Sequence, residues 1–278
     1  MIENVLWIAV ALMVISSILP KRQTIRNLIG GLGWGFFSIH WAYQPIHYLG
    51  INDYANVVLT LTVAAFCLML AHSMVKGYFK DHQNTELTIG STVNVTSMAT
   101  SATAIGALFY FPFAQMPTLN TWIISEVTNQ VMWMLNLLNY PALRESWDIV
   151  SLNGYRVQII LACTAIESIA LFTGLIISVN APTKRLASAF LVSVPVIYGL
   201  NLIRDAFVII AYGEQWFGAN SFEIAHHMIA KAGSGVALFF IAYAVLKILP
   251  ELLELIDGLW QLITERLHNV VQKVTGNH

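Results

Sequence analysis

Long apolar stretches alternate with short polar ones along most of the chain. A helix needs about 20 mostly apolar residues to cross a membrane. Stretches of this kind predict seven spans, at residues 4–20, 27–46, 54–76, 92–113, 162–181, 186–212 and 223–248. The fourth is the least apolar of the seven and is rich in Ser, Thr, Ala and Gly, which let helices pack closely in lipid.

Three segments do not follow this pattern of continuous apolar stretches. Apolar residues from Ile123 to Leu138 recur at helical spacing between polar ones, which predicts an amphipathic helix at the membrane interface. The pair Asn153-Gly154 then separates two β-rich runs, and this pair is a strong signal for a hairpin turn. After Pro250, leucines recur on one helical face, so residues 249–278 predict an amphipathic helix on the membrane surface.

The composition fits an integral membrane protein. The 278 residues are 57% hydrophobic and 10% charged, with a mean hydropathy of +0.66, whereas soluble domains carry about 25% charged residues. A net charge of −1 gives no indication of a nucleic-acid partner. We therefore expect an all-α polytopic fold in four regions, at 1–113, 114–160, 161–248 and 249–278.

The basic residues predict the orientation of this fold. They cluster in alternate connections, which places these connections in the cytosol by the positive-inside rule. The N-terminus, region 114–160 and the active site described below are then outside the cell, the C-terminus is cytosolic, and the first span precedes its basic cluster and is not a cleaved signal peptide. The residues are Lys21, Arg22, Arg26, Lys76, Lys80, Lys184, Arg185 and Lys247.

Ionisable side chains inside the last three spans are candidates for function, because such groups are costly in lipid. Counted from the nearest cytosolic Lys or Arg, Cys163, Arg204 and Lys231 lie roughly 32, 28 and 24 Å along their helices. All three therefore lie at a similar height in the outer leaflet. The polar residues of this set are Cys163, Glu167, Arg204, Asp205, His226, His227 and Lys231.

Cys163 stands where the hairpin ends and the fifth span begins. Thr164 and Glu167 have the spacing of a capping box, which would place Cys163 at the first turn of a helix. The helix dipole and Arg204 would then both favour a thiolate, which is the nucleophile that covalent catalysis needs.

Each of these residues also has a purely structural interpretation. Cys163, like Cys67, is a residue type that often packs as a small hydrophobe, and two distant cysteines form neither a disulfide framework nor a zinc site. Arg204 and Asp205 could be a structural ion pair oriented by Asn201, and Lys231 could extend to the headgroups. His226 and His227 lie near the outer interface, and Glu167 could serve only as the cap partner of Thr164.

The segments around these residues resemble the exosortase/archaeosortase family. They are "LACTAIES" around Cys163, "NLIRDAFVI" around Arg204, and "AHHMIAKAGSGVALF" around His227 and Lys231. The resemblance covers residues 130–245, and spans one to four are similar only in being apolar.

The resemblance implies a cysteine transpeptidase of the plasma membrane that faces the cell exterior. Its substrates would be secreted proteins with a C-terminal sorting signal, made of a Pro-Gly-Phe type motif, a hydrophobic span and a basic tail. Cys163 would form a thioester, Arg204 would stabilise the oxyanion or the thiolate, and a membrane lipid would accept the protein. No metal or organic cofactor is implied.

The third catalytic position is ambiguous, because Lys231 stands where the resemblance leads us to expect Arg. His227 lies one turn earlier and could act as acid and base, with Lys231 as electrostatic support. Two other functions remain open. One is a transporter that binds an anion at Arg204, Lys231 and the histidines. The other is an assembly factor that docks a partner through residues 249–278.

Overall fold

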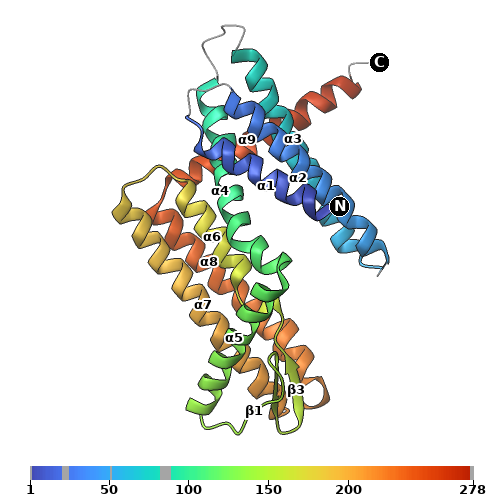
Figure 1. Ribbon diagram of the computed structural model, residues 1–278, viewed down its shortest axis with the longest axis vertical. Helices are drawn as coiled ribbons and strands as arrows, with labels where there is room; N and C mark the ends of the chain where they lie inside the picture. Colours follow the sequence, from blue (N-terminus) through green and yellow to red (C-terminus); the bar gives the residue numbers. More distant parts are fainter. Residues whose placement is uncertain (1, 21–24, 51, 82–88, 276–278) are drawn as a thin grey trace. The chain divides into compact units, whose positions relative to one another are not determined.

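The computed structural model describes residues 2–20, 25–50, 52–81 and 89–275 (Figure 1). Most of them are helical, and a small antiparallel sheet follows α5. The elements are α1 (Ile2–Ile18), α2 (Ile25–Gly50), α3 (Tyr54–Asp81), α4 (Ile89–Gln115), α5 (Pro117–Leu137), β1 (Leu143–Arg144), β2 (Ile149–Leu152), β3 (Tyr155–Gln158), η1 (Leu161–Cys163), α6 (Ile166–Ser178), α7 (Thr183–Gly213), η2 (Gly218–Asn220), η3 (Glu223–Ala230), α8 (Lys231–Ile248) and α9 (Glu251–Thr275).

The helices confirm a multi-pass membrane protein, but not the number of its spans. Among the described residues, three segments are long and apolar enough to cross a membrane: Tyr54–Phe79, Thr183–Gly213 and Glu223–Ile248. Asn4–Ile18 and Ile166–Ser178 are apolar but shorter. The count of seven spans and the orientation therefore stay predictions, and Lys21 and Arg22, on which the orientation partly rests, lie outside the described residues.

The chain divides into two compact units. The N-terminal unit holds residues 1–105 together with 177–180 and 250–278, and the central unit holds 106–176 and 181–249. Four separate regions were predicted from the sequence, and that division stays a prediction.

Within the N-terminal unit, glycines of α2 allow close packing against α1 and α3. A Cβ at Gly31 would lie 2.7 Å from Cγ2 of Val75 and 3.1 Å from the carbonyl oxygen of Ala71, both in α3. A Cβ at Gly33 would lie 3.2 Å from the carbonyl oxygen of Ala9 in α1. Only glycine fits such approaches without a shift of the neighbouring backbone.

Arg26 lies buried at the beginning of α2, whereas the sequence placed it in the basic cluster that follows the first span. Its Nε donates to the backbone oxygen of Ser16 at 2.9 Å, and its Nη2 donates to Ser97 Oγ. The Ser16 hydroxyl donates in turn to the backbone oxygen of Arg26 at 2.9 Å. These bonds compensate for taking the guanidinium out of water.

The central unit contains the predicted amphipathic helix and hairpin. In α5, residues Ile124, Val127, Val131 and Leu135 are buried at helical spacing, so the amphipathic pattern is confirmed. They pack in one core with β2, β3 and the C-terminal half of α7. The membrane-interface position of α5 stays a prediction.

The hairpin turn forms at Asn153 and Gly154, as the sequence predicted. Both have positive φ, 52° and 85°, and the flanking residues Leu152 and Tyr155 are paired. This is the backbone of a type I′ turn, which suits the twist of two-residue hairpins. Asn153 Nδ2 donates to the backbone oxygen of Gly213 at 3.2 Å, which fixes the turn to the end of α7. The additional strand β1, paired with β2, was not predicted from the sequence.

Candidate active site

Cys163 is placed by the connection between the sheet and α6. The backbone N–H of Ile159 donates to the backbone oxygen of Asp148 at 2.7 Å, and the backbone N–H of Cys163 donates to the backbone oxygen of Ile160 at 2.8 Å. The chain therefore turns sharply and buries Cys163, which is 9% exposed and belongs to the core of the central unit. Cys163 and Cys67 are both free thiols.

The predicted capping box at the start of α6 is wrong. The hydroxyl of Thr164 donates backwards, to the Leu161 oxygen at 2.7 Å, and Ala165 has a φ of 59°. Helical bonding begins with the N–H of Ile169, which donates to the Ala165 oxygen at 3.0 Å. The left-handed residue separates Thr164 from the helix, so Thr164 cannot cap it, and Cys163 precedes the helix instead of occupying its first turn.

Glu167 is consequently free of the capping role. It is an exposed residue of the first turn of α6, and its Oε1 accepts a hydrogen bond from the Tyr110 hydroxyl at 3.2 Å. Tyr110 belongs to the end of α4, so this contact joins two helices of the central unit. This pairing could not be predicted from the sequence, because the two residues are far apart in the chain.

Three residues of α7 meet the cysteine segment. Asn201 Nδ2 donates to the backbone oxygen of Cys163 at 2.5 Å and to Asp205 Oδ2 at 3.2 Å. Nη2 of Arg204 pairs with the other carboxylate oxygen of Asp205 at 3.2 Å. Asn201 and Asp205 are one turn apart and both are buried, so α7 presents a connected polar group to Cys163 in an apolar surrounding.

Arg204 retains hydrogen-bonding capacity beyond its bond to Asp205. Its side chain is 23% exposed, and its buried Nε has no hydrogen-bond partner within the described part of the chain. A guanidinium carries five donors in a fixed plane, so the pair with Asp205 leaves donors for a further acceptor. Arg204 can therefore be held by Asp205 and still bind a developing negative charge.

Two opposed effects act on the Cys163 thiol, which lies in η1 ahead of α6. Burial raises the pKa of this thiol, and the negative charge of Asp205 raises it further. Three effects lower the pKa, but less than burial raises it. They are a hydrogen bond with the backbone of Ile160, the positive charge of Arg204 and a hydrogen bond with Arg204. Burial therefore opposes the thiolate that the sequence predicted, and Arg204 favours it.

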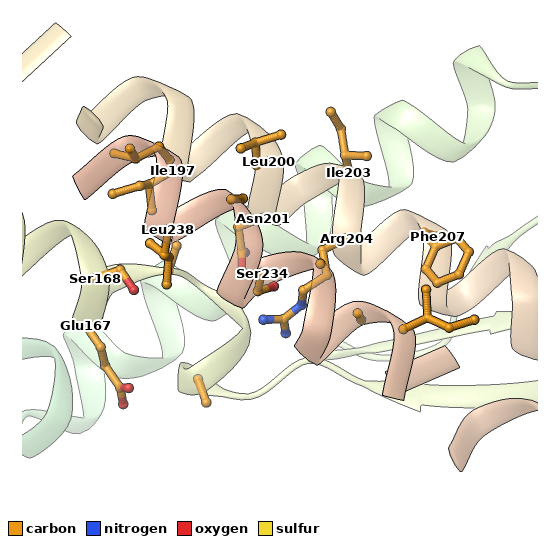
Figure 2. Close-up of a pocket in the computed structure, with 17 residues that line it drawn as sticks. Glu167, Ser168, Ile197, Leu200, Asn201, Ile203, Arg204, Phe207, Ser234 and Leu238 are labelled. Atoms are coloured by element: carbon orange, nitrogen blue, oxygen red, sulfur yellow. The ribbon is translucent and has the colours of Figure 1, made fainter. Parts of the chain in front are cut away.

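A pocket opens beside this group, between α6, α7 and the segment formed by η3 and α8. Its volume is about 500 Å³, within the range of ligand sites. Figure 2 shows the Arg204 side chain extended into it from α7, while Glu167 and Ser168 line it from α6. Ala162 and Ala165, on either side of the Cys163–Thr164 pair, also line it. The other lining residues are Ile197, Leu200, Asn201, Ile203, Phe207, Ile229, Ala230, Gly233, Ser234, Ala237, Leu238 and Ile241.

The segment that carries the histidines is a π-helix, Glu223–Ala230, continuous with α8. π-Helical turns are rare and occur often at functional sites. The sequence predicted one regular helix here, because α- and π-helices share nearly the same apolar pattern.

The two histidines differ in their surroundings. His226 is half-buried, its ring stacks on Phe222 with centroids 5.2 Å apart, and it interacts electrostatically with Arg204. Its buried Nδ1 has no hydrogen-bond partner among the described residues. The side chain of His227 is 51% exposed, and its Nε2 lies 3.8 Å from Oε2 of Glu223. Lys231 is exposed and does not line the pocket.

No cluster suited to a metal ion accompanies this group. Within the described ranges, no three His, Cys, Asp or Glu side chains lie close enough to bind one. Of the charged side chains near Cys163, Asp205 is paired with Arg204, and Glu167 accepts a hydrogen bond from the Tyr110 hydroxyl.

The sequence matches the transmembrane exosortase family over residues 3–247. The chain belongs to this family. Two proteins named archaeosortase A are similar to this exosortase. The one from Haloferax volcanii is 25% identical, over 93% of this chain and 92% of its own. The one from Natronomonas pharaonis is 22% identical, over 92% of this chain and 87% of its own. No solved structure matches the chain.

Membership confirms the family resemblance that the segments around Cys163, Arg204 and His227 indicated. The match also extends to the N-terminal spans, which resembled the family in the sequence only by being apolar. In the structure of this exosortase, Cys163, Asn201, Arg204 and Asp205 lie together, while His227 and Lys231 lie apart from the pocket.

Proposed function

We propose that this exosortase is a cysteine transpeptidase that cleaves C-terminal sorting signals from secreted proteins. The observation that carries the proposal is the contact of a buried cysteine segment with Asn201, Arg204 and Asp205 beside an open pocket. A packing cysteine needs no such polar partners, and Cys67 is a free thiol buried at 1% exposure in the apolar helix α3.

The chemistry begins with attack of the Cys163 sulfur on the scissile carbonyl carbon. The carbon–sulfur bond forms, the carbonyl oxygen becomes an oxyanion, and the free donors of Arg204 stabilise this charge. The carbon–nitrogen bond then breaks, and the proton lost by the thiol goes to the leaving amine. The product is a thioester on Cys163, and the hydrophobic segment with its basic tail departs.

We assign the proton transfer to His226. Its ring stacks on Phe222, and its buried Nδ1 has no hydrogen-bond partner among the described residues, which supports a role as the group that accepts the thiol proton and passes it on. His227, which the sequence favoured, is paired with Glu223 on an exposed surface. Lys231 then supplies only long-range positive charge.

The thioester is resolved by a nucleophile on a membrane lipid. Its attack on the thioester carbon releases Cys163 as a thiol and joins the secreted protein to the lipid. We place this reaction on the extracellular side of the plasma membrane, with the N-terminus outside and the C-terminus in the cytosol. The positive-inside distribution of Lys and Arg supports this orientation.

The proposal is tested with a secreted reporter that ends in a Pro-Gly-Phe type motif, an apolar segment and a basic tail. Cells with Cys163→Ala should keep the tail on the reporter, with a rate at least about a thousandfold lower. Cys67→Ala, the other free thiol, should process the reporter normally. Unimpaired processing by Cys163→Ala would contradict the proposal.

A further inference from the structure

The pocket beside Cys163 has one wall made of small side chains. Ala230, Gly233, Ser234 and Ala237 follow each other at helical spacing where η3 continues into α8, and all four line the pocket. The facing walls carry larger apolar side chains, among them Leu200 and Phe207 (Figure 2). The space is therefore widest against the backbone of α8.

Packing within the chain does not explain the glycine of this wall. A Cβ at Gly233 would meet no atom within 4 Å. By contrast, Gly106 in the same unit is needed, because its Cβ would lie 3.2 Å from the Ala170 backbone oxygen. Gly233 thus faces open space in the middle of this wall, and small side chains let another helix approach closely in lipid.

Two opposite charges line this mostly apolar space. Arg204 extends into it from α7, and Glu167 lines it from α6. The Tyr110 hydroxyl occupies one oxygen of Glu167, and a carboxylate has a second oxygen that can accept more hydrogen bonds. The pocket therefore offers both a donor and an acceptor to an apolar ligand.

We propose that this pocket seats the first turns of the substrate's hydrophobic helix, which rests on the proposed function as a sorting transpeptidase. The helix would pack on Gly233 and its small neighbours. The first turn of a helix has free N–H groups and a positive dipole end. The Glu167 carboxylate can accept hydrogen bonds from these N–H groups, and its negative charge suits the dipole end. The scissile carbonyl precedes that turn in the chain, which places it toward Arg204.

A helix fits these features better than a lipid. Acyl chains have no need of a small-residue wall, because they adapt to the side chains they meet. A phosphate group drawn to Arg204 would be repelled by Glu167, whereas a peptide supplies an acceptor for Arg204 and donors for Glu167. A lipid or a second copy of this chain as the occupant is an outcome that the experiment below distinguishes.

The occupant is identified by photocrosslinking in membranes, with Cys163→Ala to hold the reporter unprocessed. A photoreactive amino acid replaces Leu238, which lines the pocket, or Phe240, an exposed apolar residue of α8 that does not. We expect a crosslink from position 238 to the apolar segment of the reporter, at least about tenfold stronger than from position 240. Equal crosslinks, crosslinks only to lipid, or crosslinks to a second copy of the enzyme would overturn the proposal.

A matched pair of glycine variants tests the wall in the active enzyme. Gly233→Leu should slow processing about tenfold through KM, whereas Gly235→Leu, outside the pocket and equally free of neighbours, should not change it. Equal rates for both variants would refute the docking site. If Cys163 remains essential in that case, the proposed transpeptidase function stands, so the two failures are distinguishable.

Discussion

Arg26 and Arg204 are both arginines near a membrane helix, one in each unit, yet their surroundings differ. Arg26 is 5% exposed and donates to Ser16 and Ser97, which belong to neighbouring helices. Arg204 is paired with its own helical neighbour Asp205 and retains a buried Nε without a partner in the described chain. A guanidinium whose donors bind the fold is structural, whereas one that keeps donors at a pocket can bind a ligand.

Individual glycines show a similar contrast, and both kinds of glycine occur in each unit. Gly31 and Gly33 of α2 are required by close packing against α3 and α1. Gly199 of α7 and Gly233 of α8 face open space. In a membrane protein, an open space beside a small residue is filled by lipid or by another helix, so only the first kind of glycine is explained by the fold of this chain.

The largest difference between the units should appear when each arginine is replaced by lysine. Arg204→Lys keeps the charge but loses the planar donor fork, so processing of the reporter should fall about 100-fold while the protein stays folded. Arg26→Lys should instead lower the unfolding free energy by about 1.5–3 kcal/mol, because hydrogen bonds of a charged group are lost. Reporter cleavage measures the loss of activity, and thermal unfolding in detergent measures the loss of stability. A loss of stability alone for Arg204→Lys, with a loss of activity alone for Arg26→Lys, would contradict the assigned roles.

Alanine at each of the two histidines of η3 should change the rate of reporter processing by very different factors. His226→Ala should slow processing about 100-fold, because the proton carrier is lost. His227→Ala removes only an exposed pair with Glu223, which contributes under about 1 kcal/mol. Initial rates of reporter cleavage at equal enzyme levels measure the difference. A larger loss from His227→Ala would return the acid–base role to His227.

The smallest effects should come from alanine at the glycines. Gly31→Ala should destabilise the N-terminal unit by about 1–3 kcal/mol, because its Cβ would overlap Val75 and the Ala71 backbone. Gly199→Ala should raise stability by up to about 1 kcal/mol, because alanine favours the helix and meets no atom within 4 Å. Unfolding midpoints in detergent report both, and equal shifts would remove the distinction between the two kinds of glycine.

The features that the sequence predicted well are local ones. The Asn153-Gly154 turn and the buried face of α5 follow from residues within one element, and both are present. The set of Cys163 and Arg204 was found because polar residues are conspicuous in apolar spans. The family resemblance rested on the same residues.

The features that the sequence missed depend on distant contacts or on backbone strain. Ala165 is left-handed because the chain must turn between η1 and α6, and alanine gives no local signal for that conformation. The burial of Arg26 depends on Ser16 and Ser97 from other helices. The π-helix depends on backbone geometry that the apolar pattern does not encode.

The central claim is that Cys163 forms a covalent bond to the substrate, and mass spectrometry of the enzyme tests it most directly. The reporter is incubated with purified enzyme in detergent without added lipid, so that the acceptor is scarce. We expect the reporter, shortened by its apolar segment and tail, attached to Cys163 through a bond that hydroxylamine cleaves, with Cys67 unmodified. A shortened reporter that appears with Cys163 unmodified throughout, or that forms equally with Cys163→Ala, would contradict the account.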